Sequence, residues 1–174
     1  MIIIKEIDID DIDSAENLKD IIKRLTVGEG YYFHFRRENN FFLTDEEIRK
    51  FRDEIPAYLN SNGKYLIKDK IDDERFDSIG FLTVNEDTYA QVLALWKYFE
   101  GVTFFSPSKL LTWEKYEEIY DKIKPEEYGI GIIQNKYADS VFIKGHDGDN
   151  LIFVYGPNYD ESLVTQVIQI IENF

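Results

Sequence analysis

The feature that most constrains the fold is a close succession of three strand candidates in the last third of the chain. The segments GIGIIQ (129–134), SVFIKG (140–145) and NLIFVYG (150–156) are rich in β-branched and aromatic residues, which favour strands. The links between them are short and contain turn-forming residues, as in HDGD (146–149). A parallel crossover needs about a dozen residues or more, so these links predict an antiparallel C-terminal meander of three strands.

Five earlier segments also have the composition or alternation of strands: residues 2–8, 31–37, 64–68, 78–84 and 102–106. The alternation is clearest in YYFHFRR (31–37), which places Tyr31, Phe33 and Phe35 on one face and Tyr32, His34 and Arg36 on the other.

Apolar residues at helical spacing predict helices over residues 14–25, 45–59, 86–100, 112–123 and 160–173. Thr44 with Glu47 three residues later forms a capping box at the start of the second helix, and Pro56 is expected to kink or end that helix. Strands and helices do not alternate regularly. The sequence therefore predicts a single α+β domain over residues 1–174, with a mixed or largely antiparallel sheet packed by about five helices.

The charge of the chain restricts its partners. It has 34 acidic and 20 basic residues, which gives a formal net charge of −14. Nucleic acid and anionic lipid are bound through Lys and Arg, so this chain should repel both and attract a basic protein. The absence of cysteine excludes disulfides, thiolate catalysis and cysteine-ligated zinc, and it fits a cytoplasmic location.

The segment EIDIDDID (6–13) concentrates acidic residues near the start of the chain. Carboxylates at this point could cap the helix expected from about Ser14, contact a basic partner or hold a metal ion. A calcium loop also needs a glycine, and the first glycine in the chain is Gly28. Asp10, Asp11 and Asp13 are therefore partner-binding candidates, with no metal expected.

A second acidic segment, KDKIDDERFD (68–77), is expected to be an exposed loop. Either it is a solvated loop that aids solubility, or it is a contact surface for a basic protein, with one aromatic residue as anchor. The candidate contact residues are Asp72, Asp73, Glu74, Phe76 and Asp77.

No motif for catalysis, metal or cofactor binding emerges from the sequence. HDGDN (146–150) lacks the order of a calcium-binding loop and is typical of a hairpin turn. His34 is expected on the polar face of a strand, without a catalytic motif beside it. GIG (129–131) lacks the third glycine of a dinucleotide-binding loop, because position 134 is Gln134. We therefore expect a protein that is not an enzyme and has no cofactor.

In its size, acidity and lack of cysteine the chain resembles the small acidic immunity proteins of bacterial polymorphic-toxin systems. That resemblance implies a cytoplasmic, non-enzymatic protein that blocks a nuclease-like toxin by occluding its cationic surface. The alternatives are an enzyme of unfamiliar type that uses Asp or Glu with a divalent metal, and a DNA mimic or anti-restriction protein. A DNA mimic needs segregated acidic stripes, and here the 34 acidic residues are diluted by 20 basic ones.

Overall fold

The computed structural model describes residues 2–8, 30–37, 44–72, 75–83, 85, 87–99, 101–107, 110–123, 129–144, 150–157, 159, 160, 162, 165, 166 and 169. The helix expected at 14–25 lies outside these residues, and the helix expected at 160–173 lies mostly outside them. The same holds for Asp10, Asp11, Asp13 and the turn at 145–149.

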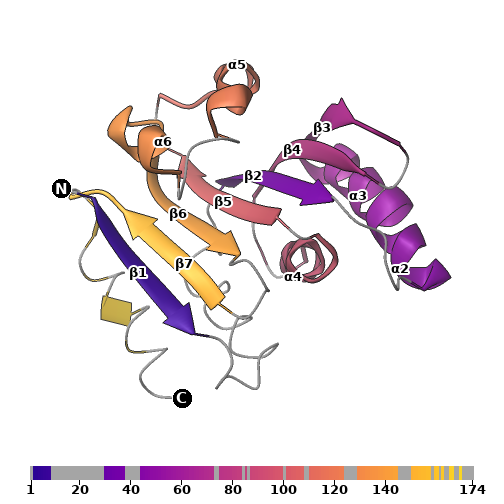
Figure 1. Cartoon of the computed structure of the whole chain (residues 1–174), viewed down its shortest axis with the longest axis horizontal. Coiled ribbons are helices and arrows are strands. Elements are labelled where there is room, and N and C mark those ends of the chain that lie inside the picture. The colour runs from indigo at the N-terminus through magenta and orange to yellow at the C-terminus, as the bar shows by residue number, and fades with distance from the viewer. Residues whose placement is uncertain are drawn as a thin grey trace.

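The described residues form an α+β fold around one seven-stranded antiparallel sheet (Figure 1). Its strands are β1 (Ile3–Asp8), β2 (Gly30–Arg37), β3 (Lys64–Lys70), β4 (Phe76–Thr83), β5 (Gly101–Pro107), β6 (Ala138–Lys144) and β7 (Asn150–Tyr155). In space they follow the order β1-β7-β6-β5-β2-β4-β3, and every neighbouring pair is antiparallel. The antiparallel sheet expected from the sequence is confirmed.

The expected C-terminal meander is confirmed for its last two strands and wrong for its first. β6 and β7 form a hairpin, whereas residues 129–134 contain the short helix α6 (Ile130–Gln134). Gly129 begins this helix with a left-handed φ of 62°, and Ile132 and Ile133 pack into the core. A helical turn can bury these two isoleucines as well as a strand can, so the short apolar run did not distinguish a helix from a strand.

Helices cover both faces of the sheet (Figure 1). On one face lie α3 (Ile55–Asn62) and α4 (Tyr89–Tyr98), and on the other lie α5 (Trp113–Ile123) and α6. The side chains of β2 divide as expected: Tyr31, Phe33 and Phe35 join the core under α3 and α4, whereas Tyr32 joins the core under α5. Because both faces of the sheet are covered, β2 is buried along nearly its whole length, polar residues such as His34 and Arg37 included.

A continuous helical segment from Asp45 to Asn62 consists of α2 (Asp45–Arg49), a π-helical turn η1 (Lys50–Glu54) and α3. The predicted capping box is present, because Glu47 N–H donates to Thr44 Oγ1 at 3.2 Å and Thr44 N–H donates to Glu47 Oε2 at 2.9 Å. Pro56 does not end the helix. The wider π turn comes immediately before it, where Ile55 N–H donates to the carbonyl of Lys50, and such turns accommodate a ring that would otherwise clash with the preceding carbonyl.

Candidate functional site: the β3–β4 hairpin and helix α5

The acidic segment 68–77 is mostly a hairpin, not an exposed loop. Residues 68–70 belong to β3 and residues 76–77 to β4, and the two strands pair directly, with Lys70 opposite Phe76. A register shift between Ile67 and Asp69 marks a β-bulge in β3. The expected loop is wrong because Asp69 and Lys70 pair with Asp77 and Phe76 of β4, so the strand extends into the charged residues.

The turn of this hairpin neutralises part of its own charge. The carboxylate of Asp72 accepts hydrogen bonds from the backbone N–H of Arg75 at 2.8 Å and from its Nε at 2.7 Å. The hydrogen bond and the charge of the same carboxylate raise the pKa of the Arg75 guanidinium. Asp73 and Glu74 lie outside the described residues.

Phe76 and Asp77 are interior residues, which corrects their expected exposure on a protruding loop. Each is only 5% exposed. Phe76 packs edge-to-face against Phe99 with ring centroids 6.0 Å apart, in the core under α4. A side chain committed to this core is not available as the aromatic anchor of a contact surface.

Asp77 faces the opposite side of the sheet and meets α5. The hydroxyl of Tyr120 lies 2.9 Å from Asp77 Oδ2 and 3.3 Å from Asp69 Oδ2. A phenol has one proton, so it donates to one carboxylate at a time, and the shorter distance favours Asp77. This contact joins β3, β4 and α5 through side chains that are 43 and 51 positions apart in the sequence.

His34 extends this cluster from β2, and its expected place on a polar strand face is wrong. It is 7% exposed, because α5 covers the face to which it points. Its Nε2 lies 3.9 Å from Asp77 Oδ1, and its ring meets the ring of Tyr120 edge-to-face at 5.7 Å. His34, Asp77 and Tyr120 are each less than a tenth exposed, so a substrate cannot reach them while α5 is in place. The arrangement fits a structural link between α5 and the sheet.

Within the described part of the chain, no group of three or more His, Cys, Asp and Glu side chains is arranged to hold a metal ion. Asp69 and Asp77 lie near each other because both are within hydrogen-bonding distance of the Tyr120 hydroxyl, which donates to one of them at a time.

Helix α5 is also linked to the edge strand β3 by lysines. Lys68 Nζ donates to the backbone carbonyl of Glu117 at 3.3 Å and lies 5.4 Å from the centre of the Tyr120 ring. The second lysine is Lys64, whose charge acts on Glu114 of α5. The pKa of the Glu114 carboxyl is lowered by hydrogen bonds from the Glu114 backbone N–H and the Thr112 hydroxyl, and the ammonium of Lys64 lowers it further.

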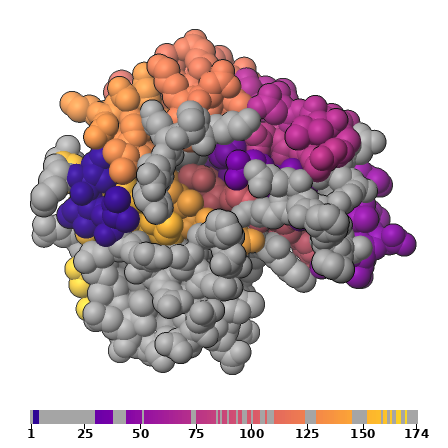
Figure 2. Space-filling model, in the orientation of Figure 1, coloured from indigo at the N-terminus to yellow at the C-terminus, as the bar shows by residue number. Residues whose placement is uncertain are grey.

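The outward side of α5 is acidic, with Glu114, Glu118 and Asp121 exposed. Glu118 forms an ion pair with Lys115, whose Nζ lies 2.6 Å from Glu118 Oε2. Figure 2 shows the surface of α5, in salmon at the top, adjoining the magenta surface of the β3–β4 hairpin. The two elements therefore present one continuous surface.

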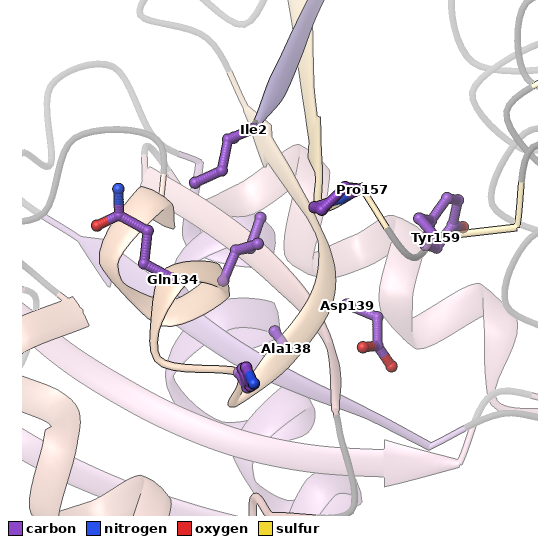
Figure 3. Close-up of a pocket in the computed structure, with 9 residues that line it drawn as sticks. Ile2, Gln134, Ala138, Asp139, Pro157 and Tyr159 are labelled. Atoms are coloured by element: carbon purple, nitrogen blue, oxygen red, sulfur yellow. The ribbon is translucent and has the colours of Figure 1, made fainter.

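A hollow of about 240 Å³ lies at another place, where the end of β7 meets α6 and the start of β6 (Figure 3). Its lining consists of Ile2, Ile133, Gln134, Lys136, Ala138, Asp139, Gly156, Pro157 and Tyr159. Burial raises the pKa of the Tyr159 phenol, so it remains protonated at neutral pH. The hollow is smaller than the usual range of about 300–1,000 Å³ for ligand pockets, and of the candidate contact residues that the structure describes, Asp72, Phe76 and Asp77, none lines it.

Sequence reasoning missed Tyr120, Asp69 and Lys68 as members of one cluster. The helical spacing of Trp113, Tyr116, Ile119, Tyr120 and Ile123 predicts one buried stripe on this helix, and Tyr116, Ile119, Tyr120 and Ile123 are buried. A tyrosine in such a stripe usually finds a hydrogen-bond partner for its hydroxyl, which is the signal that could have directed attention to a buried polar group on the sheet.

Among the residues that the structure describes, no helix is long and apolar enough to cross a membrane.

Comparisons with known proteins give no family for this chain. No family model and no curated protein matches the sequence. Among solved structures, the extra-membranous domain of the secretin HofQ from Actinobacillus actinomycetemcomitans matches 83% of this chain and 98% of its own, with 11% sequence identity and a TM-score of 0.23. A likeness at that level carries no argument about fold or function.

Proposed function

We propose that this protein is a non-enzymatic acidic binding protein that neutralises a basic protein partner in the cytoplasm, and specifically an immunity protein that blocks a nuclease-like bacterial toxin. The observation that carries the proposal is the charge of −14. The exposed carboxylates on the outer side of α5 support it, as does the use of His34, Asp77 and Tyr120 in an interior link rather than in an open site.

The physical basis is electrostatic complementarity. A nuclease needs a cationic surface to hold phosphates, and a carboxylate-rich protein can occupy that surface. Long-range attraction raises the association rate, while close contacts of apolar and aromatic groups lengthen the residence time. Carboxylates and large aliphatic side chains are both exposed among the residues that the structure describes.

Affinity capture at two ionic strengths tests the proposal. The purified protein is immobilised, exposed to extract of its native cells at low salt, and washed at low or high salt. We expect a basic protein to be retained in stoichiometric amount at low salt and to be released more readily at high salt, because screening weakens the attraction.

A growth assay then tests neutralisation directly. The captured basic protein is produced in a bacterial host with and without this chain, and we expect it to stop growth only when this chain is absent. Recovery of a small molecule or metal alone would favour a metal-dependent enzyme, and recovery of a nucleic-acid-processing complex would favour DNA mimicry. Either result overturns the proposal.

A further inference from the structure

The edge of the sheet formed by β3 is open and partly apolar, a combination that favours pairing with another chain. The strand order ends at β3, and among the described residues no element pairs with its outer side. Five large hydrophobic side chains of the described chain are exposed, and three of them lie in β3 or directly after it: Leu66, Ile67 and Ile71, which are 37%, 41% and 73% exposed. Backbone N–H and C=O groups along such an edge can accept a further strand, and a second copy of this chain supplies an identical edge.

The lysines of β3 oppose the pairing of two copies. Two copies related by a twofold axis pair antiparallel, with one residue of β3 opposite its own counterpart. With Ile67 at this centre, Lys64 of one copy lies opposite Lys70 of the other, and with Leu66 at the centre Lys64 lies opposite Lys68. Like charges directly opposite each other destabilise a strand pair, and the twofold axis makes each of these pairs occur twice in the dimer.

The remaining registers of β3 are no more favourable. A register centred on an ionised residue places that residue opposite itself, which applies to Lys64, Lys68, Asp69 and Lys70. A register centred on Tyr65 avoids like charges, but only residues 64–66 then pair, because the strand begins at Lys64. Every register that pairs a longer part of β3 therefore brings like charges together.

Two further features weaken pairing at this edge. The Lys68 side chain turns toward α5, where its Nζ donates to the Glu117 carbonyl at 3.3 Å and lies 5.4 Å from the centre of the Tyr120 ring. An added strand would remove this inward-turned charge from water, which costs free energy. The bulge between Ile67 and Asp69 increases the twist of the strand and interrupts the regular row of edge groups.

We infer that the lysines of β3 keep the free protein from assembling with itself through this edge, and that a second copy of this chain is the strand partner that the edge accepts once like charges no longer lie opposite each other. Natural sheets protect their edges with lysines, inward-turned charges and bulges, and β3 has all three. The inference concerns the free protein and is independent of the proposed function.

Sedimentation equilibrium of charge variants tests this inference. Lys64→Thr combined with Lys70→Thr removes the like-charge pairs from the registers centred on Ile67 and Leu66, and it retains the contact of Lys68 with α5. Lys115→Thr combined with Lys122→Thr is the matched control, because it makes the same change in net charge at helix residues outside the sheet.

The wild type is expected to remain a monomer. We expect the edge variant to dimerise with a dissociation constant at least about tenfold below that of the wild type, and the control variant to behave as the wild type does. Both variants are more acidic than the wild type, so overall repulsion increases equally in the two. A gain in dimerisation that is confined to the edge variant therefore comes from the edge.

Lys70→Glu tests the same contact by turning repulsion into attraction. In the register centred on Ile67 the introduced carboxylate lies opposite Lys64, and the twofold axis forms this opposite-charge pair twice. Lys122→Glu makes the same change in net charge on α5 and is the control. We expect Lys70→Glu to dimerise and Lys122→Glu to remain a monomer.

Hydrogen exchange locates the contact in any dimer that forms. Amides of β3 should exchange more slowly as the protein concentration rises, while those of β6, which has a strand on each side, should keep their rates. Urea unfolding of each variant checks that the fold is retained. The two edge variants differ in chemistry, so one that fails to fold leaves the other to decide.

Dimers of the edge variants with slower exchange in β3 support the inference. Four results overturn it: folded edge variants that remain as monomeric as their controls, controls that dimerise to the same extent, dimers without slower exchange in β3, and a wild type that itself pairs through β3.

Discussion

At Gly63, between α3 and β3, the backbone of β4 approaches so closely that a β-carbon would collide with the carbonyl oxygen of Phe81. Gly63→Ala should therefore destabilise the protein by about 1–3 kcal/mol, because the backbone must move to make room. Gly101→Ala is the control, since its nearest neighbour would be Arg36 Cβ at 3.4 Å. Urea unfolding measures both, and equal stability of the two variants would contradict the close approach.

Tyr120 is a second residue whose side chain is expected to contribute to stability, because its hydroxyl links α5 to β4. Tyr120→Phe removes the hydroxyl that donates to Asp77 and should cost about 1–3 kcal/mol, because a buried side chain loses one of its hydrogen bonds. Tyr58→Phe, which removes an exposed hydroxyl 3.5 Å from the Asp87 carbonyl, should change stability by less than about 0.5 kcal/mol.

A double-mutant cycle shows whether the Tyr120 effect comes from this contact. Asp77→Leu is close to the aspartate in size and removes the oxygen that accepts from Tyr120. If Tyr120 and Asp77 act together, the two substitutions combined should cost less than the sum of the single ones, by at least about 0.5 kcal/mol. Strict additivity would mean that the hydroxyl stabilises the protein elsewhere.

Among the elements, the helical segment 45–62 depends on its first turn. Thr44→Ala removes the hydroxyl that accepts from Glu47 N–H, and we expect a loss of about 1 kcal/mol. Thr44→Ser retains the hydroxyl and should be close to the wild type. The free energy of unfolding from urea titration distinguishes them, and equal values for the alanine and serine variants would exclude a capping contribution.

The Glu114 carboxyl, at the start of α5, makes the stability of the protein depend on pH. Its pKa is lowered by hydrogen bonds from its own backbone and from Thr112, and to a smaller extent by the charge of Lys64 on β3. The pKa of Glu114 is lowered from its ordinary value of 4.5, so its contribution to stability is present above the unfolded-state pKa and is lost as the pH falls through the folded-state value. Lys64→Met should raise the pKa of Glu114 slightly, because Lys64 is a minor cause of the shift. Carbon-detected NMR titration measures this, with Lys122→Met as the control expected to leave Glu114 unchanged.

Local features of this fold can be predicted from the sequence, whereas contacts between distant segments cannot. The seven strands, the capping box at Thr44 and the buried stripe of α5 follow from periodicity and capping chemistry, which involve residues close in sequence. The helix at 130–134 was missed because a short apolar run suits either structure. The interior position of Asp77 was missed because Tyr120 of α5, which covers it, lies 43 residues later in the sequence.

At the scale of the whole molecule, the proposed function predicts that negative charge on α5 controls the rate of association with the basic partner. Glu114→Lys with Asp121→Lys should slow association with the basic partner at low salt and weaken the salt dependence of the rate, because steering depends on local negative charge. Asp53→Lys, on η1 in the helical segment that packs on the opposite face of the sheet, is a control for a charge change away from α5. An equal effect per charge at both places would show that only net charge matters.

The pairing of β1 with β7 determines when the sheet can be completed. Ile3 lies opposite Tyr155 and Asp8 lies opposite Asn150, so the first of the described strands hydrogen-bonds to the last of them. During translation β1 cannot pair with β7 until residues 150–155 have been synthesised. Such distant pairing slows folding, so we expect β1 to join the sheet late in folding and, until then, to leave the apolar edge of β7 exposed to aggregation or to chaperones.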